Sequence, residues 1–208
     1  MTITNELSHI HRFVPASVSG RPPILLLHGT GGDETDLLPF GQTVAPGAAL
    51  LSPRGKVLEN GMPRFFRRLA EGVFDEADLR ARANDLADFI GEAREAYGLA
   101  APIAVGFSNG ANIAAALLQL RPEALAGAAL LRAMLPLSDT PAERLDGKSV
   151  LILSGAMDPI VSAESAGGLA ALLEHAGATV DHRVLPVGHG LSQADLSITK
   201  DWLRRLNG

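Results

Sequence analysis

The chain has 208 residues, a net charge of −5 and no cysteine. This length suits one domain with a substantial buried core, so we predict a single domain over residues 1–208. The negative charge gives no overall attraction for nucleic acid, and the absence of cysteine excludes disulfides, thiolate zinc sites and a cysteine nucleophile. No apolar run reaches transmembrane length, and Met1–Val14 lacks the apolar core of a signal peptide. We therefore expect no membrane insertion and a cytoplasmic location.

In chain order, short apolar runs alternate with longer segments of helical period, a pattern typical of a mostly parallel sheet with helices on both faces. An edge strand is possible near Arg12–Ala16. The predicted strands are Ile24–Leu27, Ala48–Leu51, Ile103–Val105, Gly127–Leu131, Val150–Leu153 and Thr179–Leu185. The predicted helices are Asp78–Tyr97, Asn109–Leu120, Ser162–His175 and Ser192–Leu206. Pro53–Arg68 and Ala133–Lys148 follow strands and are predicted to be irregular, site-forming loops.

The sharpest local signal is Gly106-Phe107-Ser108-Asn109-Gly110, a G-x-S-x-G between an apolar strand and an apolar helix. A tight strand-to-helix turn of this kind, the nucleophile elbow, lifts its serine clear of the sheet. Gly106 and Gly110 suit the turn because a Cβ at either position would crowd the neighbouring strand or helix. The motif also occurs by chance, so its position and its partners carry the prediction that Ser108 is a nucleophile.

A serine hydroxyl needs an adjacent base, and His189 is the best candidate. It stands in Pro186-Val187-Gly188-His189-Gly190, between the last predicted strand and the last predicted helix, where small neighbours let an imidazole reach across the strand ends. The remaining candidates lie in the polar N-terminal segment, at a helix end or inside a strand, which is typical of surface or packing residues. These candidates are His9, His11, His175 and His182.

The acid that orients the base should fall between serine and histidine in chain order. Asp158 fits best because Ser154-Gly155-Ala156-Met157-Asp158-Pro159 follows a predicted strand, as the other two site loops do. The competing interpretation is that Asp158 only caps the next helix. Asp139, Asp146 and Asp181 are less suitable acids.

A tetrahedral intermediate needs hydrogen-bond donors for its oxyanion, and backbone amides suit this role. One candidate is the amide of Asn109, at the start of a helix. The other is the amide of Thr30, in the glycine-rich turn His28-Gly29-Thr30-Gly31-Gly32-Asp33. A phosphate loop is the alternative interpretation of this turn, but no Gly-Lys-Ser/Thr follows, and Glu34 breaks the G-x-G-x-x-G spacing. We therefore expect no nucleotide cofactor.

Four motifs in register resemble the phospholipase/carboxylesterase family of small α/β-hydrolases, which includes acyl-protein thioesterases and lysophospholipases. The resemblance runs from about Pro23 to Leu203. It rests on Leu27-His28-Gly29-Thr30-Gly31-Gly32-Asp33, Gly106-Phe107-Ser108-Asn109-Gly110, Gly155-Ala156-Met157-Asp158-Pro159 and Pro186-Val187-Gly188-His189-Gly190. It implies hydrolysis through an acyl-enzyme without metal or cofactor, with Ser108, Asp158 and His189 as the triad and the amides of Thr30 and Asn109 as the oxyanion hole.

Two departures limit what the resemblance implies about substrate. The thioesterases of the family usually carry Gln after the nucleophile, where this chain has Asn109, and Arg54–Arg68 does not match their pattern. The chain looks closer to a bacterial branch known as carboxylesterases or linked to resistance to aromatic compounds and quinones. The substrate class is therefore no more specific than a carboxylic ester or thioester.

No insertion long enough for a separate lid domain lies between Leu131 and Val150, so we expect an open, shallow site for short to medium acyl groups. Arg54 and Arg64 are candidates to pair with a substrate carboxylate, with solvated surface arginines as the more ordinary interpretation. The acyl pocket is predicted to be lined by five residues, although several of them are equally plausible as ordinary core. These are Phe65, Phe66, Met134, Leu135 and Ile160.

Two other functions stay open at this point. One is a non-catalytic ligand-binding protein on the same scaffold, although a receptor has no chemical need for the complete set of polar residues. The other is a different reaction of the triad, such as perhydrolysis or carbon–carbon cleavage. The expected partner is a small-molecule ester or thioester, with no nucleic acid, and a homodimer is possible.

Overall fold

A seven-stranded sheet runs through the protein in the strand order β1-β3-β2-β8-β9-β10-β11. The computed structural model describes residues 7–137, 139 and 144–206, so residues 1–6 of the polar N-terminal segment lie outside the described residues. All neighbouring strands are parallel except β1 and β3, which confirms the mostly parallel sheet. The strands are β1 (His11–Val14), β2 (Ile24–Leu27), β3 (Leu50–Pro53), β8 (Ile103–Phe107), β9 (Gly127–Leu131), β10 (Ser149–Gly155) and β11 (Thr179–Leu185).

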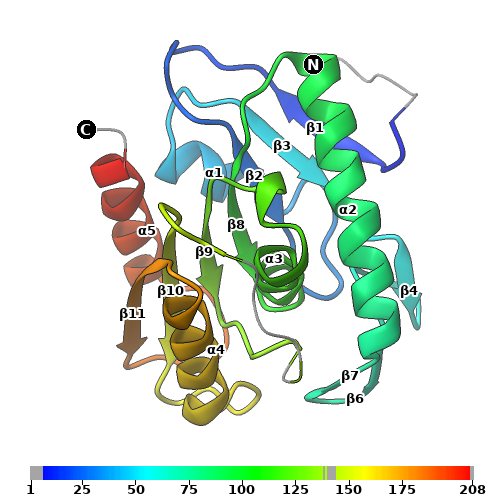
Figure 1. The fold of residues 1–208 in the computed structure, drawn as a ribbon, viewed down its shortest axis with the longest axis vertical. Coiled ribbons are helices and arrows are strands. Elements are labelled where there is room, and N and C mark those ends of the chain that lie inside the picture. The colour runs from blue at the N-terminus through cyan, green and yellow to red at the C-terminus, as the bar shows by residue number, and fades with distance from the viewer. Residues whose placement is uncertain (1–6, 138, 140–143, 207–208) are drawn as a thin grey trace.

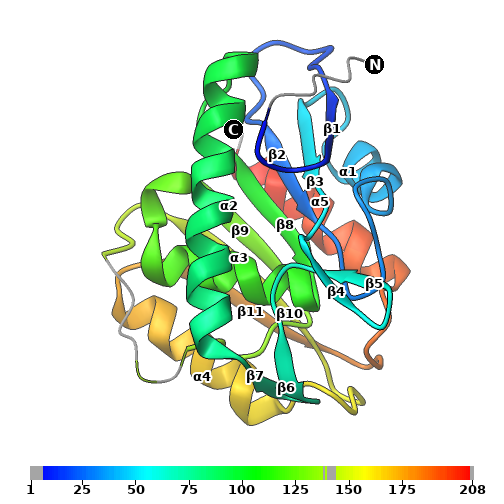
Figure 2. The same ribbon diagram turned by 90° about the vertical axis from the view of Figure 1, so that its right-hand side faces the viewer.

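Helices cover both faces of this sheet (Figures 1 and 2). They are α1 (Leu38–Val44), α2 (Glu76–Tyr97), α3 (Asn109–Leu120), α4 (Ala163–His175) and α5 (Gln193–Leu206), with a short 3-10 turn at Pro122–Ala124. Successive strand side chains point to opposite faces, so β2 contributes to two cores. Leu25 and Leu27 pack with α2, α3 and α4, whereas Leu26 packs with α1 and α5. This arrangement is the predicted fold class.

The structure corrects the prediction of an irregular loop at Pro53–Arg68. This segment carries an antiparallel hairpin of β4 (Val57–Glu59) and β5 (Met62–Arg64), and a second hairpin of β6 (Arg68–Ala70) and β7 (Val73–Phe74) begins at its end. The first hairpin turns at Asn60 and Gly61, with φ angles of 52° and 79°. Both values are typical of a type I′ turn, which Asn-Gly favours. Strands of three residues are too short to show alternation in the sequence.

Helix α1 was not predicted either. It has seven residues, with Pro39 near its start and Gly41 in its middle, so it spans too few turns to display a helical period. Its apolar side chains nevertheless fill the core between the sheet and α5.

The loops that carry the predicted site residues leave the carboxyl ends of β2, β8, β10 and β11. Because these strands are parallel, their carboxyl ends meet at one edge of the sheet, where ligands bind in folds of this type. Residues 132–148 connect β9 to β10 and are too few for a separate lid domain, as expected. In the described part of the chain, no helix is long and apolar enough to cross a membrane.

Candidate active site

The turn between β8 and α3 holds Ser108 in a backbone conformation that few non-glycine residues adopt. Its φ is 52° and its ψ is −113°. A Cβ added to Gly106 would meet the carbonyl of Gly110, and a Cβ added to Gly110 would meet the carbonyl of Leu27. The close backbone approach therefore requires both glycines, as predicted for a nucleophile elbow. Strain of this kind is typical of functional sites.

Three side chains from three loops meet at this turn. Nε2 of His189, which follows β11, lies 2.9 Å from Oγ of Ser108. Nδ1 of the same ring lies 2.8 Å from Oδ2 of Asp158, which follows β10. A carboxylate only accepts hydrogen bonds, so Nδ1 carries the imidazole proton and Nε2 accepts a hydrogen bond from the serine hydroxyl. This arrangement can transfer a proton from Ser108 to His189.

The local contacts of Asp158 keep its carboxyl group ionised. Burial raises the pKa of Asp158, but hydrogen bonds from the amides of Ile160 and Val161, at 2.8 and 3.1 Å, and from His189 outweigh that effect. The pKa of Asp158 is consequently below its ordinary value, and the group is a carboxylate at neutral pH. The N-cap of α4 is Ser162, so capping that helix does not explain Asp158.

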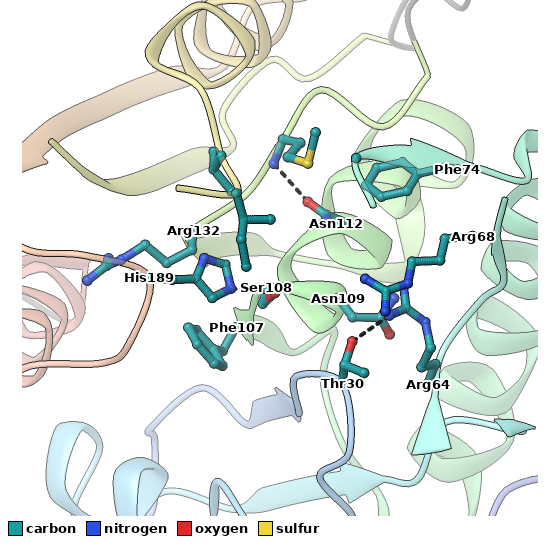
Figure 3. A pocket seen from close by; sticks show the side chains of 14 residues that line it. Thr30, Arg64, Arg68, Phe74, Phe107, Ser108, Asn109, Asn112, Arg132 and His189 are labelled. Atoms are coloured by element: carbon teal, nitrogen blue, oxygen red, sulfur yellow. Dashed lines mark hydrogen bonds between the residues drawn. The ribbon is translucent and has the colours of Figure 1, made fainter. Parts of the chain in front are cut away.

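Two backbone amides in the cleft beside the serine have no acceptor among the described residues. Neither the amide of Thr30 nor that of Asn109 donates to any described residue, and both residues line the cleft (Figure 3). The turn before Thr30 is fixed by His28, whose Nδ1 donates to the next carbonyl at 2.7 Å and whose Nε2 accepts from the amide of Gly55 at 3.0 Å. Fixed, unpaired amides are what an oxyanion hole requires.

The cleft has a volume of about 220 Å³. A cleft of this size suits a short acyl group. Figure 3 shows Ser108 in the middle of the cleft, with His189 on one side and Arg64 and Arg68 on the other. Within the described residues, the lining contains arginines and asparagines but neither Asp nor Glu. In the same part of the chain, no group of three or more His, Cys, Asp or Glu could hold a metal ion.

Of the five residues predicted to line an acyl pocket, Met134 and Ile160 line the cleft and three do not. Phe65 and Phe66 are almost fully buried in the core that includes α2 and α3. Leu135 packs against the same core. For these three residues the structure favours the core interpretation that the sequence left open.

Comparison with known proteins decides the family. A model of the phospholipase/carboxylesterase family matches residues 10–207. The chain belongs to the phospholipase/carboxylesterase family. It is 45% identical to MhqD of Bacillus subtilis (strain 168) over 183 residues, which cover 87% of this chain and 92% of that protein.

Two solved carboxylesterases resemble this phospholipase/carboxylesterase family member closely. The crystal structure of the Bacillus cereus carboxylesterase has a TM-score of 0.93 and 46% sequence identity, and the match covers 95% of this chain and 94% of that one. The carboxylesterase from Mesorhizobium loti has a TM-score of 0.91 and 35% identity, with 98% of both chains covered. The protein is therefore an enzyme of the hydrolase class with the α/β-hydrolase fold.

In this hydrolase a buried arginine holds the loop that carries His189, a feature that the sequence analysis missed. Arg132 follows β9, is fully buried and donates to the carbonyls of Gly188 and Gly190, at 3.0 and 3.2 Å. Its Nη1 and Nη2 atoms donate to the two carboxylate oxygens of buried Asp195, at 2.8 and 2.9 Å. An arginine directly after a fully apolar strand was the available signal.

Arg54 and Arg64, the two arginines proposed from the sequence to pair with a substrate carboxylate, have different surroundings in the structure. Arg54 pairs with Glu34, with Nε 2.5 Å from Oε2 and Nη2 2.9 Å from Oε1, and does not line the cleft. Arg64 is only 3% exposed and does line the cleft. The solvated-surface interpretation therefore does not hold for Arg64.

Proposed function

We propose that the protein hydrolyses carboxylic esters or thioesters with Ser108, His189 and Asp158 as its catalytic triad. The observation that carries this proposal is the continuous hydrogen-bond chain from Ser108 Oγ through His189 to Asp158, with steps of 2.9 and 2.8 Å. Family membership supports ester hydrolysis and disfavours the non-catalytic binding protein.

In the proposed mechanism, His189 removes the proton of Ser108 while Oγ attacks the acyl carbon. The amides of Thr30 and Asn109 donate to the oxyanion that forms, and Asp158 stabilises the imidazolium. His189 then protonates the leaving oxygen or sulfur, which departs and leaves the acyl group on Ser108. A water molecule repeats the sequence and releases the carboxylic acid.

The size of the cleft supports short to medium acyl groups, because about 220 Å³ beside the nucleophile cannot enclose a long chain. The choice between oxygen and sulfur esters, the cytoplasmic location and a homodimer stay predictions. Perhydrolysis uses the same triad with peroxide in place of water, and the first experiment distinguishes it.

That experiment measures hydrolysis of p-nitrophenyl esters of increasing chain length, with and without hydrogen peroxide. We expect turnover of the acetate and butanoate above that of the long-chain esters, and a loss of at least about 10³-fold in Ser108→Ala. Ser197→Ala removes an exposed serine hydroxyl on α5 and is the matched control. Equal turnover by Ser108→Ala would refute the proposal, and turnover that requires peroxide would favour perhydrolysis.

A further inference from the structure

The guanidinium groups of Arg64 and Arg68 lie at the side of the cleft opposite His189 (Figure 3). They share a single carboxylate, that of Glu59. Nε and Nη2 of Arg68 donate to Oε1 of Glu59 at 2.9 and 2.7 Å. Nε of Arg64 lies 3.1 Å from Oε2 of the same carboxylate. One negative charge thus faces two positive charges, and this part of the cleft keeps a net positive charge.

Each of these two arginines has N–H groups that donate to no acceptor among the described residues. Nη1 of Arg64 donates to Oγ1 of Thr30 at 2.6 Å, and its Nε also donates to the carbonyl of Phe66 at 3.2 Å. No described residue accepts a hydrogen bond from Nη2 of Arg64 or Nη1 of Arg68. Burial lowers the pKa of Arg64, Glu59 opposes this, and the charge of Arg68 adds to it. A second anion would relieve the repulsion between the two cations.

Two asparagine side chains of α3 add further donors to the same cleft. Oδ1 of Asn109 accepts from the amide of Phe65 at 2.7 Å, and Oδ1 of Asn112 accepts from the amide of Met134 at 2.8 Å. Because a backbone N–H only donates, both side-chain orientations are fixed and both Nδ2 groups are left over. Asn109 is only 2% exposed, and its Nδ2 is buried without a hydrogen-bond partner in the described part of the chain.

We infer that this part of the cleft binds a carboxylate at the end of the substrate's acyl group, and that the enzyme prefers monoesters of short dicarboxylic acids. Four donor groups without acceptors match a carboxylate, which accepts several hydrogen bonds and pairs with guanidinium groups. The inference rests on the proposed function of Ser108.

The position of His189 assigns this carboxylate to the acyl group and not to the leaving group. His189 must reach the leaving oxygen to protonate it, so the leaving group lies on the His189 side of Ser108. The acyl group then extends toward Arg64 and Arg68 (Figure 3). Hydrolysis consumes one water and yields the alcohol and a dicarboxylate.

The kinetic test compares monoethyl succinate with ethyl butanoate, which differ only by a carboxylate in place of the terminal methyl of the acyl group. We expect kcat/KM for monoethyl succinate to be at least about tenfold higher than for ethyl butanoate. The neutral ester has no carboxylate and therefore cannot form the charged hydrogen bonds with the arginines. A second pair places the charge on the leaving group: 4-acetoxybenzoate and p-tolyl acetate. If the enzyme prefers 4-acetoxybenzoate to p-tolyl acetate but does not prefer monoethyl succinate to ethyl butanoate, the assignment of the carboxylate to the acyl group is overturned.

Variants connect the preference to the two arginines. We expect Arg64→Gln and Arg68→Gln each to reduce the ratio of the two kcat/KM values toward one, with the partly exposed Arg68 as the safer substitution for folding. Arg67→Gln removes the same charge from an exposed side chain outside the cleft and is the matched control. An unchanged ratio in both cleft variants, or an equal loss in Arg67→Gln, would overturn the inference.

A binding test does not depend on turnover. Calorimetry with Ser108→Ala protein should show that monoethyl succinate binds at least about tenfold more tightly than ethyl butanoate, and that Arg68→Gln removes the difference. If the wild-type protein hydrolyses no ester but the difference in binding between the two esters remains, only the proposed function is refuted. Equal binding of both esters would refute the carboxylate site and leave the triad unaffected.

Discussion

A serine hydroxyl is a weak nucleophile by itself, and in the proposed mechanism the reactivity of Ser108 depends on contacts made by two other residues. His189 accepts its hydrogen bond at 2.9 Å, and Asp158 holds the imidazole at 2.8 Å. Asp158 is in turn oriented by two backbone amides that bond its other carboxylate oxygen. In this mechanism the nucleophilicity of Ser108 Oγ thus depends on the position of Asp158, which acts on it through His189.

Asp158→Asn tests this dependence. An amide at this position can donate to Nδ1, which stabilises the tautomer with the proton on Nε2 and removes the base from Ser108. We expect kcat to fall by about 10⁴-fold while the fold is kept, as measured by ester hydrolysis and circular dichroism. Asp146→Asn, at an exposed aspartate that was also a candidate acid, should keep wild-type turnover. Comparable losses in both variants would contradict the role of Asp158.

The meeting of Ser108, Asp158 and His189 could be predicted because each residue lies in a short motif that follows a predicted strand. On the arginine side of the cleft, Arg64 was a candidate from the sequence, but its burial and the position of Arg68 beside it could not be predicted.

Arg64 is an ordinary charged residue in the sequence, and its burial comes with the folding of residues 53–74 into two hairpins. The connection between these hairpins contacts the start of α3, where the amide of Phe65 donates to Asn109. Phe65 and Phe66 lie between the two hairpins and are buried in the core. The sequence pattern does not tell whether aromatic residues in such a connection line a cleft or pack in the core.

At the scale of elements, Arg132 connects β9, the His189 loop and the first turn of α5. Asp195 completes the connection, because its Oδ2 also accepts from the amide and the hydroxyl of Ser192, both at 2.7 Å. Arg132 and Asp195 are both fully buried. A buried ion pair is costly to break, since the remaining charge has no partner.

We therefore expect Asp195→Ala to lower the free energy of unfolding by about 3–5 kcal/mol and to reduce kcat, because the carbonyls beside His189 lose a fixed donor. Urea unfolding and ester hydrolysis measure the two effects. Asp201→Ala breaks an exposed pair with Arg204 on the same helix and should cost about 0.5 kcal/mol or less. A similar cost in both variants would show that the buried pair does not stabilise this region.

The long elements could be predicted well from sequence, because α2 and α3 span enough turns to show their period and the buried strands are uninterrupted apolar runs. The short ones could not. For β4 and β5 the Asn60-Gly61 pair was a usable signal, since this dipeptide favours the turn that the structure contains. Helix α1 gave no comparable signal.

At the scale of the whole molecule, two buried histidines make stability sensitive to acid. Burial lowers the pKa of His9 from 6.5 to about 4, with Lys56 adding to the effect and Asp85 and Glu92 opposing it. Burial also lowers the pKa of His28. The unfolded chain therefore binds protons below pH 6.5 that the folded protein does not, so the free energy of unfolding falls as the pH is lowered from 6.5 to 4.

His9→Phe tests the share of one histidine. It keeps a ring against Phe89 and removes the titration, so the loss of stability between pH 6.5 and 4 should be smaller than in the wild type by about 3 kcal/mol. Chemical denaturation at pH 6.5, 5.5 and 4 measures this difference, with the exposed His175→Gln as the control histidine. An unchanged pH dependence in His9→Phe would contradict a neutral buried His9.

The most direct test of Ser108 as the nucleophile is to locate a covalent adduct. The wild-type protein would be treated with a fluorophosphonate probe, digested and analysed by tandem mass spectrometry, with His189→Ala in parallel. We expect one adduct per chain on the peptide that contains Ser108, and strongly reduced labelling in the variant. An adduct on any other serine, or none on a protein that hydrolyses esters, would contradict the assignment of the active site.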